Sequence, residues 1–314
     1  MVGTLSHPLN VARFDPAVRR VVEGYGVLQP SVGVDLVSAN RSMFARIFSG
    51  HVGIDPYTTA VSDVYQDLFH EGNYVGKGIY DVDAFEAALE GRVPENRLLS
   101  HDLFEGSYAR TALCTDIQLV DDYPPDYRAF AARQHRWVRG DWQIARWLWR
   151  TVPDGSGRPV PNTLPLIARW KIFDNLRRSL LAPALLTLLV AGWTILPGSP
   201  WVWTGLGLLV VTFPAYAQLA RSLTNRIRGV PLRMHLAAER NSVVDTTQQA
   251  LFSLVLLPHQ AWLMIDAIVG TLWRLLITRR HLLEWVSADR QARMKRTPAV
   301  VIRPMWAAPV LAAG

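Results

Sequence analysis

The sequence predicts a mixed α/β region over residues 1–150, followed by an α-helical membrane region. In the first region, short apolar stretches that alternate around Gly and Pro, as in residues 18–34, are typical of strands and turns. Amphipathic segments of helical period lie between them. In the second region, residues 179–220 contain no Asp, Glu, Lys or Arg. The mean hydropathy of +0.11 is high for a purely soluble protein.

The charge of the chain favours a membrane over nucleic acid. A net charge of +7 and a pI near 9.8 would suit nucleic acid, anionic lipid or an anionic substrate. Many arginines flank apolar runs, so lipid head groups and membrane topology explain them better. Residues 1–150 are close to neutral, which makes nucleic acid the least favoured partner. The single cysteine, Cys114, excludes an internal disulfide.

The pattern of residues 1–150 predicts several short elements before one long helix. We expect helices at 38–48, 62–69, 84–89, about 98–113 and about 128–150, and a strand at 115–120. The glycine-rich loop at 71–78 lacks the spacing and the Ser or Thr of a phosphate-binding loop. Gly76 and Gly78 instead indicate a backbone that turns or approaches a ligand closely.

Two acidic pairs allow both a structural and a chemical interpretation. Asp81 and Asp83 could share a divalent ion, but Asp83 followed by Glu86 is more typical of a helix cap. Asp102 and Glu105 are three residues apart and share one helix face. They could interact only with the helix dipole, or Asp102 could serve as a general base. From the residues alone, the structural interpretation is favoured for both pairs.

Residues 133–142 combine arginines, tryptophans and an acid in one segment. Arg133, Arg136, Trp137 and Gly140 have the spacing that places them on one helix face. Two guanidinium groups on that face would suit an anion with several oxygens, such as a diphosphate. A basic amphipathic helix on a membrane surface would have the same pattern. These two interpretations are about equally supported by the segment itself.

The charge-free stretch predicts a transmembrane hairpin. As one straight helix it would be about 60 Å long, against about 30 Å of hydrocarbon. Pro197-Gly198-Ser199-Pro200 is the expected turn. Arginines lie on both outer flanks and none lies in the turn, so residues 1–178 are predicted to face the cytoplasm. We therefore expect a linker with an interfacial amphipathic segment at 151–178 and a hairpin at 179–222.

The remainder of the chain alternates between basic and apolar segments. Residues 223–247 predict a cytoplasmic interfacial segment. Residues 248–278 are apolar but include His259, Asp266 and Arg274, so either a third span or a re-entrant segment is possible. In a span, those polar groups would have to face protein or a wet cavity. Residues 279–314 predict a basic cytoplasmic tail.

Several long strings of the sequence together resemble the glycosyltransferase portion of cyclic β-1,2-glucan synthases. They are residues 3–32, residues 76–106, the string RQHRWVRGDWQ at 133–143, and residues 257–286. Those synthases are large multi-pass proteins of the bacterial inner membrane, related to glycosyltransferase family 2. The resemblance implies that residues 1–150 are the acceptor-side half of a nucleotide-diphospho-sugar transferase domain. It also implies transfer of glucose from UDP-glucose, with inversion, to a growing β-1,2-glucan.

The resemblance also implies roles for individual residues. Asp102 matches the general base of the family, and Glu105 supports it. Arg136 matches the arginine on the leaving diphosphate, joined there by Arg133 and Arg139. The acceptor sugar would lie at Trp137, together with Gln134, Trp142, Gly76 and Gly78. The family's Gln-x-x-Arg-Trp pattern would put its Gln at position 133, where this chain has Arg and places Gln134 one residue later.

The nucleotide-binding strands and the Asp-x-Asp metal motif of the family precede the string with which this chain begins. The resemblance therefore implies a Mg or Mn ion for the full-length enzyme, with no metal ligand expected in this chain. A missing N-terminal transferase half and a C-terminal carbohydrate-active domain are the expected partners, beside UDP-glucose, the glucan acceptor and the bilayer. We expect the isolated chain to have little or no transferase activity. A membrane-anchored, non-catalytic scaffold or interaction module is the alternative.

Overall fold

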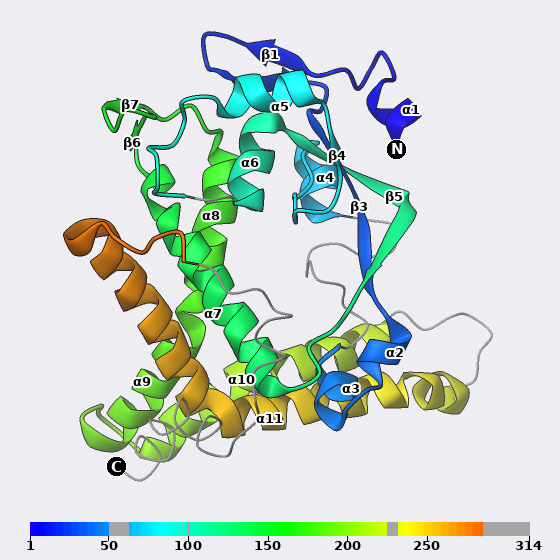
Figure 1. Cartoon of the computed structure of the whole chain (residues 1–314). Coiled ribbons are helices and arrows are strands. Elements are labelled where there is room, and N and C mark those ends of the chain that lie inside the picture. The colour runs from blue at the N-terminus through cyan, green and yellow to red at the C-terminus, as the bar shows by residue number, and fades with distance from the viewer. Residues whose placement is uncertain (50–62, 99–100, 225–231, 285–314) are drawn as a thin grey trace.

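The computed structural model describes residues 1–49, 63–98, 101–224 and 232–284. A mixed α/β part lies above a layer of long helices, and α7 and α8 run between the two (Figure 1). The upper part contains the three small sheets. The protein is thus mixed α/β but mostly helical. In chain order, its elements are α1 (Val2–Leu5), β1 (Arg13–Asp15), β2 (Arg20–Glu23), β3 (Val27–Val34), α2 (Leu36–Ala39), α3 (Met43–Ser49), α4 (Val64–Phe69), β4 (Ile79–Tyr80), α5 (Val82–Leu89), α6 (Asp102–Ala109), β5 (Thr111–Asp121), α7 (Tyr127–Gln143), η1 (Ala145–Leu148), β6 (Thr151–Pro153), β7 (Pro159–Pro161), α8 (Leu166–Ser179), α9 (Leu181–Thr194), α10 (Pro200–Thr224), α11 (Leu232–Trp273) and the π-helical η2 (Arg274–Thr278).

The largest sheet joins β3 to β5 in parallel and to β4 in antiparallel orientation. β1 pairs with β2, and β6 pairs with β7, both antiparallel. The second of these hairpins lies within residues 151–178, where the sequence predicted a linker. In Figure 1, β3 and β5 extend together from the upper part down to α2 and α3, beside the long helices.

The helix predicted at 98–113 is shorter than expected, and β5 is longer. α6 ends at Ala109, because Arg110 adopts a left-handed φ of 58°. The backbone N–H groups of Gly26 and Val27 donate to the carbonyl of Arg110. Pairing with β3 therefore begins immediately after the helix, and strand pairing outweighs the helical pattern of residues 110–113.

The acid that caps α5 is Asp81 and not Asp83. The Asp81 side chain accepts a hydrogen bond from the N–H of Ala84 at 3.0 Å, and Asp83 lies in the first turn. The capping interpretation was therefore right in kind and wrong by two residues. Within the described parts of the chain, no group of three or more His, Cys, Asp and Glu side chains is arranged to hold a metal ion.

The main core lies between α6, the end of α7, η1 and α8. Phe104, Tyr108, Ile144, Trp147 and Ile172 are buried there. The rings of Phe104 and Trp147 pack edge to face, with centroids 4.9 Å apart. This core fixes the first residues of α6 and the last turns of α7 relative to each other.

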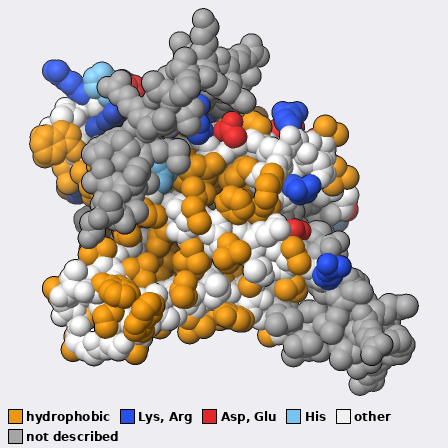
Figure 2. All heavy atoms as spheres, turned by 90° about the horizontal axis from the view of Figure 1, so that it is seen from below, with side chains coloured by type: hydrophobic (Ala, Val, Ile, Leu, Met, Phe, Trp, Pro, Cys, Tyr) orange, Lys and Arg blue, Asp and Glu red, His pale blue; other side chains and the backbone are white. Residues whose placement is uncertain are grey.

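Two helical segments are long and apolar enough to cross a membrane, namely 200–217 and 243–278. A third candidate exists if α8 and α9, which meet at 43°, form one broken span. α9 alone has 14 residues, or about 21 Å, and is too short to cross about 30 Å of hydrocarbon. Seen from below, this face carries apolar side chains over much of its middle and few charges (Figure 2). Trp193, Trp201, Phe213 and Val255 are among its exposed apolar residues on α9, α10 and α11.

α11 changes direction along its 42 residues (Figure 1). Pro258 lies inside it and has no N–H to donate to the preceding turn, which is a common cause of a helix bend. The first part runs under the molecule, and the second part rises beside α7. Of the predicted interfacial segment 223–247, residues 225–231 lie outside the described residues, as do residues 285–314 of the predicted tail.

Candidate functional site

Asp102 begins α6 and lies beneath the glycine-rich loop. The residue as a whole is exposed, and its carboxylate lies against the backbone of Gly76. A Cβ atom on Gly76 would lie 2.8 Å from Asp102 Oδ2. Gly76 also has φ of +76°, a conformation that favours glycine. The backbone of Gly76 thus turns and closely approaches the Asp102 carboxylate.

Gly78 allows a second close approach, to strand β3. A Cβ atom there would lie 2.5 Å from the backbone oxygen of Leu28. Between the two glycines, the Lys77 ammonium forms an ion pair with Asp121 at the end of β5. The loop is therefore held between the start of α6 and the β3–β5 pair.

Replacing Gly76 by Ala is expected to destabilise the protein by more than the cost of its backbone conformation alone. The new Cβ would contact the Asp102 carboxylate and displace it. Gly157 provides the matched control, because it has φ of +81° and no atom within 4 Å of its Cβ position. We expect Gly157→Ala to cost about 1 kcal/mol of unfolding free energy and Gly76→Ala about 2–3 kcal/mol. Thermal unfolding of the detergent-solubilised chain measures both, and equal losses would contradict the contact.

The electrostatic surroundings of Asp102 keep it more basic than an ordinary aspartate. Burial raises the pKa of Asp102, the nearby Glu105 carboxylate raises this pKa further, and His101 lowers it. Glu105 is itself fixed, because its Oε1 accepts a hydrogen bond from the backbone N–H of His101 at 3.2 Å. Burial also raises the pKa of Tyr74, and Asp102 and then Glu105 raise this pKa further. A tyrosine and two carboxylates thus share this corner.

The opposite wall is one face of α7. Arg133 stacks on two rings, with its Cζ 4.9 Å from the Trp137 centroid and 5.3 Å from that of Tyr123. Burial lowers the pKa of Arg133, Tyr123 and Asp121 raise it, and Arg136 lowers it. The two guanidinium groups therefore lie close enough to repel each other. Arg133 Nε is buried without a hydrogen-bond partner among the described residues, so an anion here could satisfy it.

His101 joins these two walls. A Cβ on Gly140 of α7 would lie 3.3 Å from His101 Cδ2, so the missing side chain leaves room for the imidazole. His101 Nε2 also lies 3.4 Å from Asp141 Oδ1. Gly140 is one helical turn, about 6 Å, from Arg136 on the same face. Asp102 follows His101 directly, so the first residue of α6 lies near this part of α7.

These contacts and charge interactions form a circuit that begins and ends at Asp102. From Asp102 it passes through the loop of Gly76 and Lys77 to Asp121, then to Arg133 and the adjoining Arg136 and Trp137. It returns through Gly140 and His101 to Asp102. Trp137 is 40 % exposed, which leaves part of its ring accessible. This arrangement can bring a carboxylate base, two cations and an aromatic surface to one bound molecule.

Three predicted residues lie elsewhere on α7. Arg139 lies near η2 and α11, since its pKa is lowered by burial and then by Arg274 of η2, and is raised by Glu284 and by Asp266 of α11. The indole N–H of Trp142 donates to Ser179 Oγ of α8 at 3.0 Å, on the side away from Trp137. Gln134 is about 100° around the helix from Arg133. The contact with Trp137 thus belongs to Arg133 and not to Gln134.

The sequence argument missed Tyr74, Lys77, His101, Asp121 and Tyr123. Lys77 was visible between the two glycines, and His101 precedes the candidate base directly. Asp121 and Tyr123 lie in an acidic turn that gave no sign of contact with α7. Only the parallel pairing of β5 with β3 brings that turn to Lys77 and Arg133.

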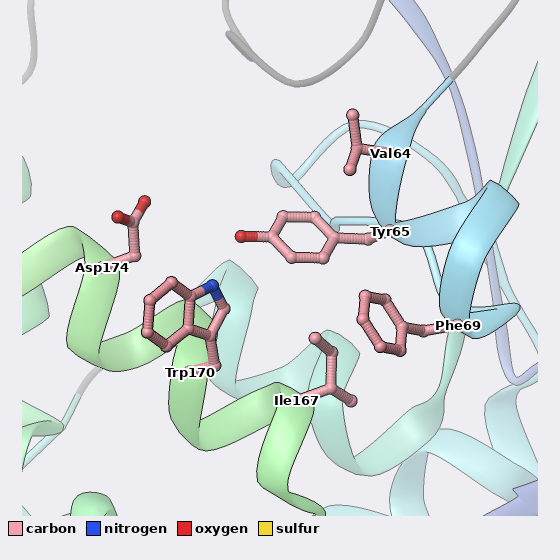
Figure 3. Close-up of a pocket in the computed structure, with 6 residues that line it drawn as sticks. All are labelled: Val64, Tyr65, Phe69, Ile167, Trp170 and Asp174. Atoms are coloured by element: carbon pink, nitrogen blue, oxygen red, sulfur yellow. The ribbon is translucent and has the colours of Figure 1, made fainter.

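A separate groove lies between α4 and α8 and has a volume of about 350 Å³. Figure 3 shows Tyr65 and Phe69 of α4 opposite Ile167 and Trp170 of α8, with the Asp174 carboxylate at one end. Asp174 is 3 % exposed and pairs with Arg177 at 2.6 Å. None of the six lining residues belongs to the circuit around Asp102, so the groove is not part of the candidate site.

No family model matches this chain. The chain is similar to the cyclic β-(1,2)-glucan synthase NdvB of Rhizobium meliloti (strain 1021), with 42 % identity over 315 residues. The alignment covers 99 % of this chain and 11 % of NdvB, so the chain spans about a ninth of that relative's length. The resemblance inferred from the sequence is thus confirmed at the level of relationship. The protein is related to a cyclic β-1,2-glucan synthase.

Proposed function

We propose that this chain supplies the acceptor side of an inverting glucosyltransferase that extends a β-1,2-glucan at the bacterial inner membrane. The observation that carries the proposal is the close approach of His101, the residue before Asp102, to Gly140 on the same α7 face as Arg136. The relationship to NdvB supports the substrate class. UDP-glucose as donor and a glucan as acceptor are part of the proposal.

In the proposed reaction, a hydroxyl oxygen of the acceptor sugar attacks the anomeric carbon of the donor glucose. Its proton passes to the Asp102 carboxylate, and the bond between the anomeric carbon and the diphosphate oxygen breaks. The diphosphate leaves with the bonding electrons, and the configuration at the anomeric carbon inverts. A raised pKa makes Asp102 a stronger proton acceptor than a fully solvated aspartate.

The cations of α7 would act on the leaving group. Arg136 and Arg133 lie on the face that borders Asp102, where guanidinium forks can bind diphosphate oxygens and stabilise the charge that develops on them. Trp137 would hold the acceptor sugar against its exposed ring surface. Tyr74 and Lys77 lie on the loop side of the same region.

A divalent cation remains expected for the complete enzyme, where it would neutralise diphosphate charge. Two of the acids have other partners. Asp81 caps α5, and Asp121 pairs with Lys77. We therefore propose neither of these two as a metal ligand.

Segment exchange tests the proposal. NdvB in which the aligned segment is replaced by this chain, here called the exchanged synthase, would be expressed in a host that makes no cyclic glucan. The alignment runs over 315 positions against 314 residues, so the exchange is nearly collinear. We expect membranes containing it to transfer radiolabelled glucose from UDP-glucose to glucan. The isolated chain in the same host should show little or no transfer.

The scaffold alternative gives a different result. A scaffold module would need neither Asp102 nor Arg136, so alanine at either position would leave glucan synthesis normal in the exchanged synthase. Loss of transfer with normal membrane insertion would favour the catalytic proposal. Immunoblotting of washed membranes gives the insertion level.

The pH at which the transfer rate falls in acid should depend on whether residue 105 carries a negative charge. Transfer requires the deprotonated base, so the rate falls as pH drops through the pKa of Asp102. Glu105 raises that pKa, so Glu105→Gln should lower it and shift the acidic limb of the rate profile to lower pH. Rate profiles of the exchanged synthase measure the shift. A limb that stays in place, or moves to higher pH, would contradict the assignment of Asp102 as base.

A further inference from the structure

The face of α7 that points away from the candidate site lies against the second half of α11. The contact begins in the first turn of α7, where the Tyr127 hydroxyl and His259 Nδ1 lie 2.7 Å apart in a hydrogen bond. Their rings also pack edge to face, with centroids 5.4 Å apart. Burial raises the pKa of Tyr127, so the phenol stays neutral and can donate its proton to the imidazole. This hydrogen bond is partly buried, and removing one partner would leave the other without it.

The histidine of this pair occupies an unusual position in α11. His259 is 4 % exposed and directly follows Pro258, inside the apolar segment 243–278. A polar group in such a segment is stable where it faces protein. The phenol of α7 provides that environment, so the bend in α11 and the start of α7 are joined at one point.

Aromatic side chains from a third element surround this point. Phe44 and Phe48 of α3 stack with centroids 4.7 Å apart. Phe44 packs against Phe130 of α7 at 5.7 Å, and Phe48 packs against Phe252 of α11 at 6.2 Å. α3, α7 and α11 are therefore packed together around the first turn of α7.

Further contacts follow along both helices in the same chain direction. His135 Nε2 lies 3.0 Å from Asp266 Oδ2, and Gln143 Nε2 donates to the Leu282 carbonyl at 2.9 Å. Between them, Val138 packs with Ala267 and Ile268. The second half of α11 thus runs parallel to α7 and contacts it along much of its length, and Leu282, beyond η2, contacts the last residue of α7.

We infer that α11 positions α7 for the transfer reaction, with Tyr127 and His259 as its positioning pair. The inference rests on the proposed function. Arg136 and Trp137 are attached to the same rigid helix, so a small rotation of α7 would move both. A displacement of 1 Å at reacting groups can lower a rate about a hundredfold. Neither Tyr127 nor His259 touches the candidate site, so any effect they have must pass through α7.

Removal of one hydroxyl tests the inference in the exchanged synthase. We expect Tyr127→Phe to lower kcat about tenfold and leave KM for UDP-glucose within about twofold, because the lost alignment matters in the transition state. Tyr216→Phe is the matched control, since Tyr216 is exposed on α10, and it should leave both constants unchanged. His259→Gln retains a hydrogen-bond acceptor for Tyr127 and should keep kcat within about threefold of the unchanged protein.

A double variant shows whether the two residues act as a pair. We expect Tyr127→Phe combined with His259→Leu to be no slower than the slower single variant, since contacting residues are non-additive. If the losses of kcat multiply in the double variant, the inference about the positioning pair fails. It also fails if Tyr127→Phe keeps the normal kcat while Asp102→Asn is inactive, and in both cases the proposed function stands. If Asp102→Asn also stays active, the proposed function itself fails. Thermal unfolding in detergent is measured for each variant. A loss of kcat that merely follows the loss of folded protein would also overturn the inference that Tyr127 and His259 position α7.

Discussion

Replacing Asp102 by Asn in the exchanged synthase is expected to lower the rate of glucose transfer about a thousandfold, since proton transfer by a positioned general base contributes about 10²–10⁴. The amide has nearly the shape of the carboxylate and cannot accept the proton. The close contact with Gly76 needs only a side chain of that shape, so the protein should fold normally. Initial rates with radiolabelled UDP-glucose measure the loss.

Asp83→Asn is the matched control for that substitution. Asp83 lies in the first turn of α5 as Asp102 lies in the first turn of α6, and it is exposed. An acid whose only role is with the helix dipole contributes about 0.3–1 kcal/mol of stability. We expect Asp83→Asn to transfer glucose at the unchanged rate. Similar rates for the two variants would indicate that Asp102 has only a structural role.

Replacing Arg136 by Ala should lower transfer about 10²–10³-fold, the usual loss when one donor to a developing negative charge is removed. The loss should appear mainly in kcat, because charge on the diphosphate grows as the bond to glucose breaks. Arg136→Lys keeps the charge without the planar fork and should recover only part of the rate. Steady-state measurements over a range of UDP-glucose concentrations separate kcat from KM.

Arg146 provides the control for the arginine series. It is exposed in η1, just beyond the end of α7, so Arg146→Ala removes the same group near the site without touching its face. We expect this variant to retain normal kcat and KM. If Arg146→Ala and Arg136→Ala lost activity equally, general charge at the membrane surface would explain the arginines better than a diphosphate site.

Local patterns predicted much of the site helix. The spacing of Arg133, Arg136, Trp137 and Gly140 indicated one face, and the structure places them so on α7. The same periodicity could not show what that face meets. The contacts that close the site join Gly140 to residue 101 and residue 77 to residue 121, and no local pattern encodes such long-range packing.

Long-range packing also determines where α6 ends and which residues the polar side chains of the apolar segments contact. The end of α6 could not be predicted, because the pairing of β5 with β3 determines it. His259 is buried against Tyr127, whereas Asp266 contacts His135 and stays largely exposed. Which helix they would meet depended on the bend at Pro258 and on the position of α7, neither of which hydropathy reports.

The central claim is that Asp102 and Arg136 act on one reaction centre, and combining their substitutions in the exchanged synthase tests it most directly. The measurement is the initial rate of glucose transfer for Asp102→Asn, Arg136→Ala and the double variant, each at the same level of membrane insertion. Residues that act as a unit are strongly non-additive. We therefore expect the double variant to be little slower than the slower single variant. Single variants with normal rates, or losses that multiply in the double variant, would contradict a shared centre.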